Sequence, residues 1–230
     1  MKLLNFAALA VVLAISVCAP ARSASTWAEG VNYFLIEPAR TPSVPAGKVE
    51  VTEVFSYACP ACNAFVPTMH KLKASLPPNA VLDFLPAAFN SSEDWPVFQL
   101  GYLTAQTLGI ADQAHDAVFK AVWQTGELAV IDPASRGAKS PLPTIEDVAK
   151  FYKTQAGIPI DKFIATSKSF AVDNKVRATE DLIQKYHVDR TPTIVINGKY
   201  RLHTESAGGP DQLIELVNYL VAKEAHAAQH

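Results

Sequence analysis

At residues 49–62 the chain reads VEVTEVFSYACPAC, a strand-like run that leads directly into a pair of cysteines. The run over 49–57 is rich in β-branched and aromatic residues, which are typical of a buried strand. After Pro60 the period changes, and apolar residues recur at helical spacing, at Cys62, Phe65, Val66, Met69, Leu72 and Leu76. The pattern therefore predicts a strand followed at once by an amphipathic helix that begins at the cysteines.

The motif Cys59-Pro60-Ala61-Cys62 indicates thiol–disulfide exchange at this junction of strand and helix. Cys59 falls at the helix N-terminus, where unpaired N–H groups and the helix dipole favour an anion, so we expect it to be the attacking thiolate. Pro60 suits the first helical position, where its missing N–H costs nothing. Cys62 lies one turn further in, and we expect it to be the shielded, resolving thiol.

Two alternatives to a redox-active Cys59–Cys62 disulfide are a static disulfide and half of a zinc site. A structural zinc site needs four ligands, and the sequence offers no second cysteine pair. We therefore expect redox chemistry, with no metal and no cofactor.

The N-terminus has the pattern of a secretory signal peptide. Lys2 supplies a positive charge, residues 3–17 are almost wholly apolar, and small residues follow up to Ala24. We expect residues 1–23 to be removed, by cleavage after Ser23 or after Ala21. A lipid-modified Cys18 is the alternative, although Val17 is larger than the residue that normally precedes such a cysteine.

The mature chain would keep about 205 residues, which is enough for one large domain or a domain with an insertion. The full-length net charge is −2, and loss of Lys2 and Arg22 makes it −4. The charge gives no sign of nucleic-acid binding, which normally requires a basic excess. In an oxidising compartment, the two remaining cysteines are too few for a disulfide scaffold and are better explained by chemistry.

The rest of the chain reads as a split α/β domain. Residues 81–84 predict a second strand, and residues 96–184 have mainly helical periodicity, with a capping box at 144–147. Asn197-Gly198 separates two strand-like runs, which is a strong hairpin signal, and residues 212–223 predict a closing helix. The predicted order is β-α-β, a helical block, and then α-β-β-α.

This order and three motifs resemble the thioredoxin superfamily and, within it, the DsbA family. The motifs are the Cys-Pro-Ala-Cys tetrapeptide after a strand, Thr191-Pro192 before the late hairpin, and a long helical block. The resemblance implies an α/β thioredoxin fold with an inserted α-helical domain. We expect residues 24–95 and 185–230 to form the thioredoxin-like domain, and 96–184 the inserted domain with its connecting helix.

The resemblance also implies roles for residues outside the cysteine pair. Thr191-Pro192 matches the cis-proline loop of the superfamily, so Thr191, Pro192 and Arg190 are expected to contact substrate. Pro60 and Ala61 are expected to tune the redox potential. Better-known DsbA proteins carry histidine between the cysteines, whereas Ala61 offers neither charge nor a side-chain hydrogen bond. We therefore predict a less acidic Cys59 and a weaker oxidant than a Pro-His version.

Glu53 is the third candidate catalytic residue. Counting by two, it shares a strand face with Val49, Val51, Phe55 and Tyr57, so its carboxylate is expected among apolar groups. Burial would raise its pKa and suit it to proton exchange with Cys62. It matches a buried acid of the family, but the lysine partner is not evident in residues 81–85. The alternative is a carboxylate that reaches solvent at the strand edge.

Other polar and aromatic residues receive no specific role. The histidines at 70, 115, 187 and 203 have no motif around them and are read as solvated or core residues. Trp95 and Trp123 are read as core or domain-interface residues, and the sequence does not place Phe89 or Phe98.

The function predicted from these observations is an exported, periplasmic oxidase that donates the Cys59–Cys62 disulfide to reduced or unfolded proteins. The family resemblance implies a DsbB-like membrane quinone reductase as its partner.

An isomerase or reductase is the nearest alternative, but such proteins usually dimerise through an added N-terminal domain, for which residues 24–48 are too few. We expect a monomer. A chaperone-like peptide-binding module is the third alternative, and Cys59→Ala separates it from the other two.

Overall fold

The computed structural model describes residues 27–227 of the chain. The predicted signal peptide and Cys18 lie outside these residues, so both stay predictions. Within the described part, no helix is both long and apolar enough to cross a membrane.

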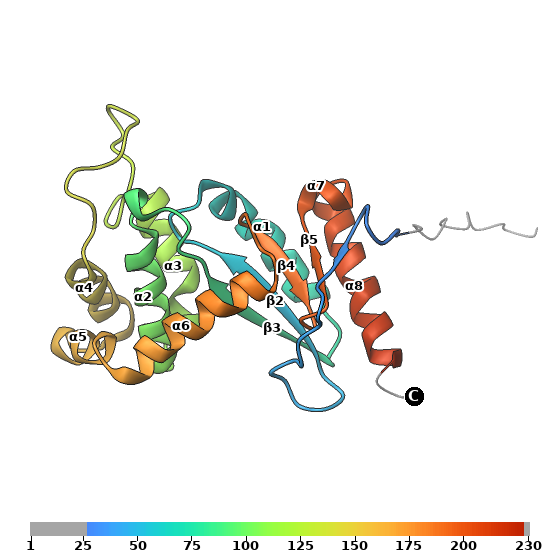
Figure 1. The fold of residues 1–230 in the computed structure, drawn as a ribbon. Helices are drawn as coiled ribbons and strands as arrows, with labels where there is room; N and C mark the ends of the chain where they lie inside the picture. Colours follow the sequence, from blue (N-terminus) through green and yellow to red (C-terminus); the bar gives the residue numbers. More distant parts are fainter. Residues whose placement is uncertain (1–26, 228–230) are drawn as a thin grey trace, which may run out of the picture.

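A five-stranded mixed sheet forms the centre of the fold (Figure 1). The strands are β1 (Phe34–Leu35), β2 (Val49–Phe55), β3 (Ala80–Pro86), β4 (Thr193–Ile196) and β5 (Tyr200–Leu202), in the spatial order β1-β5-β4-β2-β3. β2 and β3 are parallel, as the intervening helix requires, and the other pairs are antiparallel. All of β2 is buried, which places the end of this strand, just before the cysteines, inside the protein.

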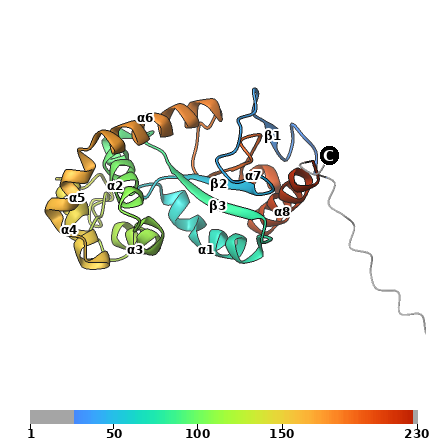
Figure 2. The ribbon, with the colours of Figure 1, turned by 90° about the horizontal axis from the view of Figure 1, so that it is seen from below.

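Two long helices cover one face of the sheet, as the views in Figures 1 and 2 show: α1 (Pro60–Ser75) and α8 (Pro210–Ala227). Phe65, Met69 and Leu72 of α1 form one apolar cluster with Val49 and Val51 of β2. Odd-numbered residues of β2 therefore face α1, because side chains alternate along a strand. The short helix α7 (Thr204–Ala207) precedes α8.

The remaining helices lie between β3 and β4 in the chain and gather at one end of the sheet (Figure 2). They are the 3₁₀ turn η1 (Ser91–Glu93), α2 (Trp95–Thr107), α3 (Ala111–Trp123), α4 (Ile145–Ala156), α5 (Ile160–Ser167) and α6 (Phe170–Lys185). α6 leads back across the other face of the sheet. A second apolar cluster joins this block to Phe55 at the end of β2 and to Tyr57 just after it.

Two local signals in the sequence are confirmed by the backbone. At the start of α4, the Thr144 hydroxyl accepts a hydrogen bond from the Asp147 N–H, and the Asp147 carboxylate accepts one from the Thr144 N–H. Asn197 and Gly198 both have positive φ, 55° and 61°, as the tight turn between β4 and β5 requires. The sequence did not predict β1, α5 or α7.

Candidate active site

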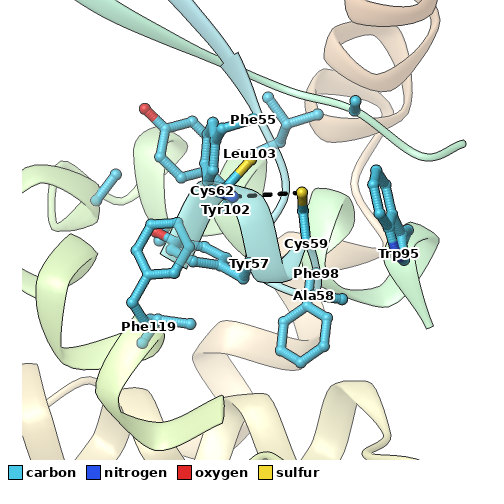
Figure 3. Packing of buried hydrophobic residues seen from close by; sticks show 14 of the residues in the cluster. Phe55, Tyr57, Ala58, Cys59, Cys62, Trp95, Phe98, Tyr102, Leu103 and Phe119 are labelled. Atoms are coloured by element: carbon cyan, nitrogen blue, oxygen red, sulfur yellow. Dashed lines mark hydrogen bonds between the residues drawn. The ribbon is translucent and has the colours of Figure 1, made fainter. Parts of the chain in front are cut away.

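Cys59 caps the N-terminus of α1, as the motif predicts. Its backbone is extended (φ −82°, ψ 117°), and Pro60 occupies the first turn of the helix. The Cys62 N–H donates a hydrogen bond to the Cys59 sulfur at 3.4 Å, so the sulfur takes the place of the usual capping oxygen (Figure 3). The structure shows both cysteines as free thiols, with Pro60 and Ala61 exposed between them.

A loop far away in sequence completes the surroundings of Cys59. Thr191 and Pro192 are joined by a cis peptide bond, as the resemblance implies. The Cys59 thiol donates to the Thr191 carbonyl oxygen at 3.6 Å, which brings together residues 132 positions apart. Both Thr191 and Pro192 are half-buried beside the thiol, where backbone groups are available to an extended peptide.

The hydrogen-bond donors around Cys59 favour its thiolate form. The Cys62 thiol can donate a hydrogen bond to the anion, and Thr191 and the N–H groups of Cys62 and Ala61 add to the effect, while burial opposes it. Together they lower the pKa of Cys59 from 9.0 to about 6. Ala61 therefore stabilises the Cys59 thiolate through its backbone N–H, although its side chain adds neither a charge nor a hydrogen bond.

Cys62 has the opposite environment. It is only 1% exposed, and burial, the hydrogen bond to Cys59 and the nearby acidic groups raise its pKa far above the usual 9.0. Negative charge therefore resides on Cys59, while Cys62 stays protonated. Such a pair can attack a disulfide through the first sulfur and resolve the intermediate through the second.

Glu53 lies on β2 and is 3% exposed, which agrees with the burial expected from the sequence. Burial, and secondarily the charge of Cys59, raise the pKa of its carboxyl group from 4.5 to about 8. Its neighbour on β3 is Phe84, not a lysine, and Glu53 also contributes to the raised pKa of Cys62. The carboxyl group is therefore protonated at neutral pH and can exchange its proton.

Arg190, the other expected substrate contact, is exposed and forms an ion pair with its neighbour Asp189, with Nε 3.2 Å from a carboxylate oxygen. An exposed pair of this kind has little effect on stability and leaves the side chain free to exchange partners. The structure places Arg190 at the start of the cis-proline loop but not against the cysteines.

Apolar side chains surround the exposed edge of Cys59. Figure 3 shows Ala58, Trp95 and Phe98 near this sulfur, and the Phe89 ring, 44% exposed, lies 6.0 Å from that of Trp95. The sequence alone did not place these rings, because they come from the loop after β3 and from α2.

Tyr57 and His115, which have no predicted role, lie together behind the cysteines. The Tyr57 hydroxyl is hydrogen-bonded to Nδ1 of His115 at 2.9 Å, and the Trp123 indole N–H donates to the Tyr57 carbonyl at 2.8 Å. Only the tertiary contact between the segment after β2 and α3 reveals this pair. Within residues 27–227, no cluster of three or more metal-binding side chains is present.

Comparison with known proteins agrees with this geometry. A family model described as thioredoxin matches residues 44–217. The thiol:disulfide interchange protein DsbA of Pseudomonas syringae pv. tomato is 34% identical over 209 residues, covering 91% of this chain and 90% of that protein. DsbA of Pseudomonas aeruginosa is also 34% identical, and its crystal structure aligns with a TM-score of 0.74 over 89% of this chain and 97% of that one. DsbA from Xylella fastidiosa is 29% identical, with a TM-score of 0.71 over 84% and 95%.

The fold and the cysteine pair thus define a thioredoxin-like protein, and the chain belongs to the DsbA family. The predicted fold class, an α/β thioredoxin fold, is confirmed. The protein is a thiol:disulfide oxidoreductase.

Proposed function

We propose that this protein is an exported oxidase that donates the Cys59–Cys62 disulfide to reduced or unfolded proteins. The observation that carries the proposal is the unequal pair of thiols: Cys59 is stabilised as a thiolate with a pKa of about 6, while burial keeps Cys62 protonated. Stabilising the reduced form in this way makes the corresponding disulfide a better oxidant.

The reaction follows from this asymmetry. A substrate thiolate attacks the Cys59 sulfur, the Cys59–Cys62 bond breaks, and Cys62 leaves with the electron pair. Since a buried Cys62 thiolate is unfavourable, the Glu53 carboxyl group gives it a proton. A second substrate thiolate then attacks the substrate sulfur of the mixed disulfide, and Cys59 leaves as the stabilised thiolate. The substrate is oxidised by two electrons and the cysteine pair is reduced by two.

The loop at 190–192 is proposed to hold the substrate chain during these steps. The Thr191 carbonyl lies beside the Cys59 sulfur, and the half-buried backbone of Thr191 and Pro192 is proposed to pair with an incoming strand. Arg190 is proposed to contact acidic substrate side chains by exchanging its partner Asp189.

The cellular role rests on the N-terminal sequence and on the family. We propose export to the periplasm, removal of the signal peptide by cleavage after Ser23 or after Ala21, a monomeric protein, and reoxidation by a DsbB-like membrane quinone reductase. N-terminal sequencing of protein from a periplasmic extract should find a chain that begins at Ala24 or Arg22. Retention in the membrane through an acylated Cys18 would contradict the soluble form.

The roles of the two cysteines can be separated with single variants. Reduced Cys62→Ser protein, treated with glutathione disulfide, should form a stable mixed disulfide at Cys59, whereas reduced Cys59→Ser should react at least tenfold more slowly because its remaining thiol is buried and protonated. Mass spectrometry identifies the product. Faster reaction of Cys62 would overturn the assignment.

Oxidase, isomerase and chaperone activities also give different results. Oxidised protein should transfer its disulfide to a reduced, unfolded protein in one stoichiometric turnover, and Cys59→Ala should abolish the transfer. A protein that repairs a scrambled substrate faster than it oxidises a reduced one would be an isomerase. Full activity of Cys59→Ala in suppressing aggregation, without any disulfide transfer from the wild type, would favour the chaperone alternative.

A further inference from the structure

A polar pocket lies behind the cysteine pair, between α1, α3 and β3. Its volume is about 160 Å³, and apolar side chains such as Val66 and Leu82 form part of its wall. Its polar lining consists of Glu53, His70, Lys73, Asp112, His115 and Asp116. A water molecule occupies about 30 Å³ in the liquid, so the pocket has room for a few waters with several polar partners.

Glu53 forms the inner end of this pocket. The side chain is 3% exposed and makes no hydrogen bond with any residue in the described part of the chain. A buried carboxyl group without a partner is unfavourable, and water in the pocket can supply the missing hydrogen bonds. The carboxyl group therefore faces both the cysteines, which its charge affects, and the polar pocket.

His115 lies in the wall of the same pocket. Its ring packs against Phe84 with the centroids 4.3 Å apart, and Phe84 is the β3 neighbour of Glu53. Nδ1 is held by the Tyr57 hydroxyl, whereas Nε2 has no hydrogen-bond partner among residues 27–227. The ring is only 8% exposed, and burial lowers its pKa from 6.5 to about 4, so it is neutral at neutral pH.

The outer end of the pocket reaches solvent. His70 on α1 and Asp116 on α3 are 2.9 Å apart, and their side chains are 58% and 50% exposed. The lining of the pocket therefore includes both exposed polar groups and a buried carboxyl group that has no hydrogen-bond partner among residues 27–227.

We infer that this pocket carries protons between solvent and Glu53 during disulfide exchange, and that His115 is the positioning residue that relays them. The inference rests on the proposed role of Glu53 as the group that exchanges a proton with Cys62. His115 does not touch the sulfurs and acts only through Glu53.

The proton balance shows why such a route is needed. Glu53 has a pKa of about 8 and is mostly protonated at pH 7, so it must first release its proton toward solvent. When a mixed disulfide at Cys59 closes, Cys62 gives its proton to the resulting Glu53 carboxylate, the Cys62 sulfur bonds to Cys59, and the substrate leaves as a thiolate. Glu53 must then release the proton to solvent before the next closure. In the opposite direction, it must take up one proton after protonating Cys62.

His115 has the chemistry for a relay. An imidazole ring can bind a proton at one nitrogen and release one from the other, and the Tyr57 hydroxyl can either donate to Nδ1 or accept from it. The free Nε2 can then hold a water molecule in the pocket next to Glu53.

The pH dependence of the relay depends on every titratable group that faces His115. These are Glu53 on β2, Tyr57 just after it, His70 and Lys73 on α1, Tyr102 on α2, and Asp112 and Asp116 on α3. Asp116 favours the protonated ring, whereas His70 and Lys73 oppose it, as does burial.

The test separates two steps of one reaction. Reduced protein is mixed with glutathione disulfide, and samples are quenched in acid and analysed by mass. Formation of the mixed disulfide depends on Cys59, whereas its closure depends on Cys62 and Glu53. His115→Ala should slow closure about tenfold at pH 7 and leave mixed-disulfide formation within about twofold. Imidazole should restore closure in this variant by occupying the vacated space.

Phe119→Ala is the matched control, because it removes a ring from the same pocket wall without removing a titratable group. It should show no imidazole rescue. If His115→Ala does not fold, His115→Gln serves instead: its amide fills similar space but cannot relay a proton, so closure should again be selectively slow.

Closure at the wild-type rate in the His115 variants would overturn the inference, and so would equal slowing in Phe119→Ala with no rescue by imidazole. Glu53→Gln distinguishes this failure from failure of the proposed function. If Glu53→Gln closes as fast as the wild type, the proton-exchange role of Glu53 is wrong. If it is slow while the His115 variants are normal, only the relay is wrong.

Discussion

Glu53→Gln should make the protein more stable at neutral pH, because it removes a buried group that ionises on unfolding. The wild-type carboxyl has a folded pKa of about 8, raised from 4.5 mainly by burial. Because the folded pKa is raised, the contribution of the Glu53 carboxyl group to stability is fully present below pH 4.5. This contribution is lost progressively as the pH rises from 4.5 through 8. Glutamine keeps the shape of the side chain but does not titrate.

The size of the effect follows from the two pKa values. Between pH 4.5 and pH 7, an interval of 2.5 pH units, the carboxyl group ionises in the unfolded protein but stays largely protonated in the folded protein. At 1.36 kcal/mol per unit, the free energy of unfolding of the wild type should fall by about 3 kcal/mol relative to the variant. Titration of Cys59 occurs in both proteins, so only its smaller coupling to Glu53 remains in the difference.

Urea unfolding of the reduced proteins at pH 4.5, 6 and 7 measures this difference. Glu224→Gln on α8 is the control of opposite sign, because Glu224 is hydrogen-bonded to Asn197, Lys199 and Tyr200, and its pKa is lowered. That variant should be less stable than the wild type by nearly the same amount at all three pH values, because the contribution of a lowered pKa is lost only as the pH falls below 4.5. A Glu53→Gln difference that stays constant within about 0.5 kcal/mol over this range would refute the account of Glu53.

Three other predictions concern the motif and the helical block. The absorbance of the Cys59 thiolate should titrate near pH 6 in the reduced protein, and Cys62→Ala should move this titration upward, since the Cys62 thiol is the main stabilising donor; an unchanged titration would contradict this. Ala61→His should make the redox potential more oxidising, and a potential that stays the same or falls would show that the residue does not tune it. Thr144→Ala should lower the stability to urea by about 1 kcal/mol through loss of the cap on α4, whereas no change would mean that this helix end is satisfied in another way.

The local part of the site could be predicted from the sequence, because it depends on neighbouring residues. The strand before Cys59, the helix after it and the turn at Asn197-Gly198 each follow from patterns within about ten residues. The burial of Glu53 was predictable from the alternation along β2. These features depend on spacing and backbone preference, which a single sequence contains.

Contacts between distant segments could not be derived in this way. The Thr191 carbonyl lies beside Cys59 only because β4 pairs with β2, and the resemblance to a family supplied that expectation. The missing lysine opposite Glu53 was apparent from residues 81–85, but the polar pocket with His115 required the packing of α3 against the sheet. The two-residue strand β1 is too short to give a pattern.

The division into a thioredoxin-like domain (24–95 and 185–230) and an inserted domain (96–184) stays a prediction. The roles of Glu53, Arg190, Thr191 and Pro192 are proposed from their position and environment.

The central claim is that the Cys59 thiolate makes the Cys59–Cys62 disulfide an oxidant, and its redox potential tests this most directly. The protein is equilibrated with glutathione buffers of known potential, and the reduced fraction is measured after acid quenching and thiol labelling. We predict a potential between the values of about −270 mV for thioredoxin and about −120 mV for the strongly oxidising DsbA, because Cys59 is stabilised but Ala61 adds no side-chain contribution. A potential at or below that of thioredoxin would contradict the account.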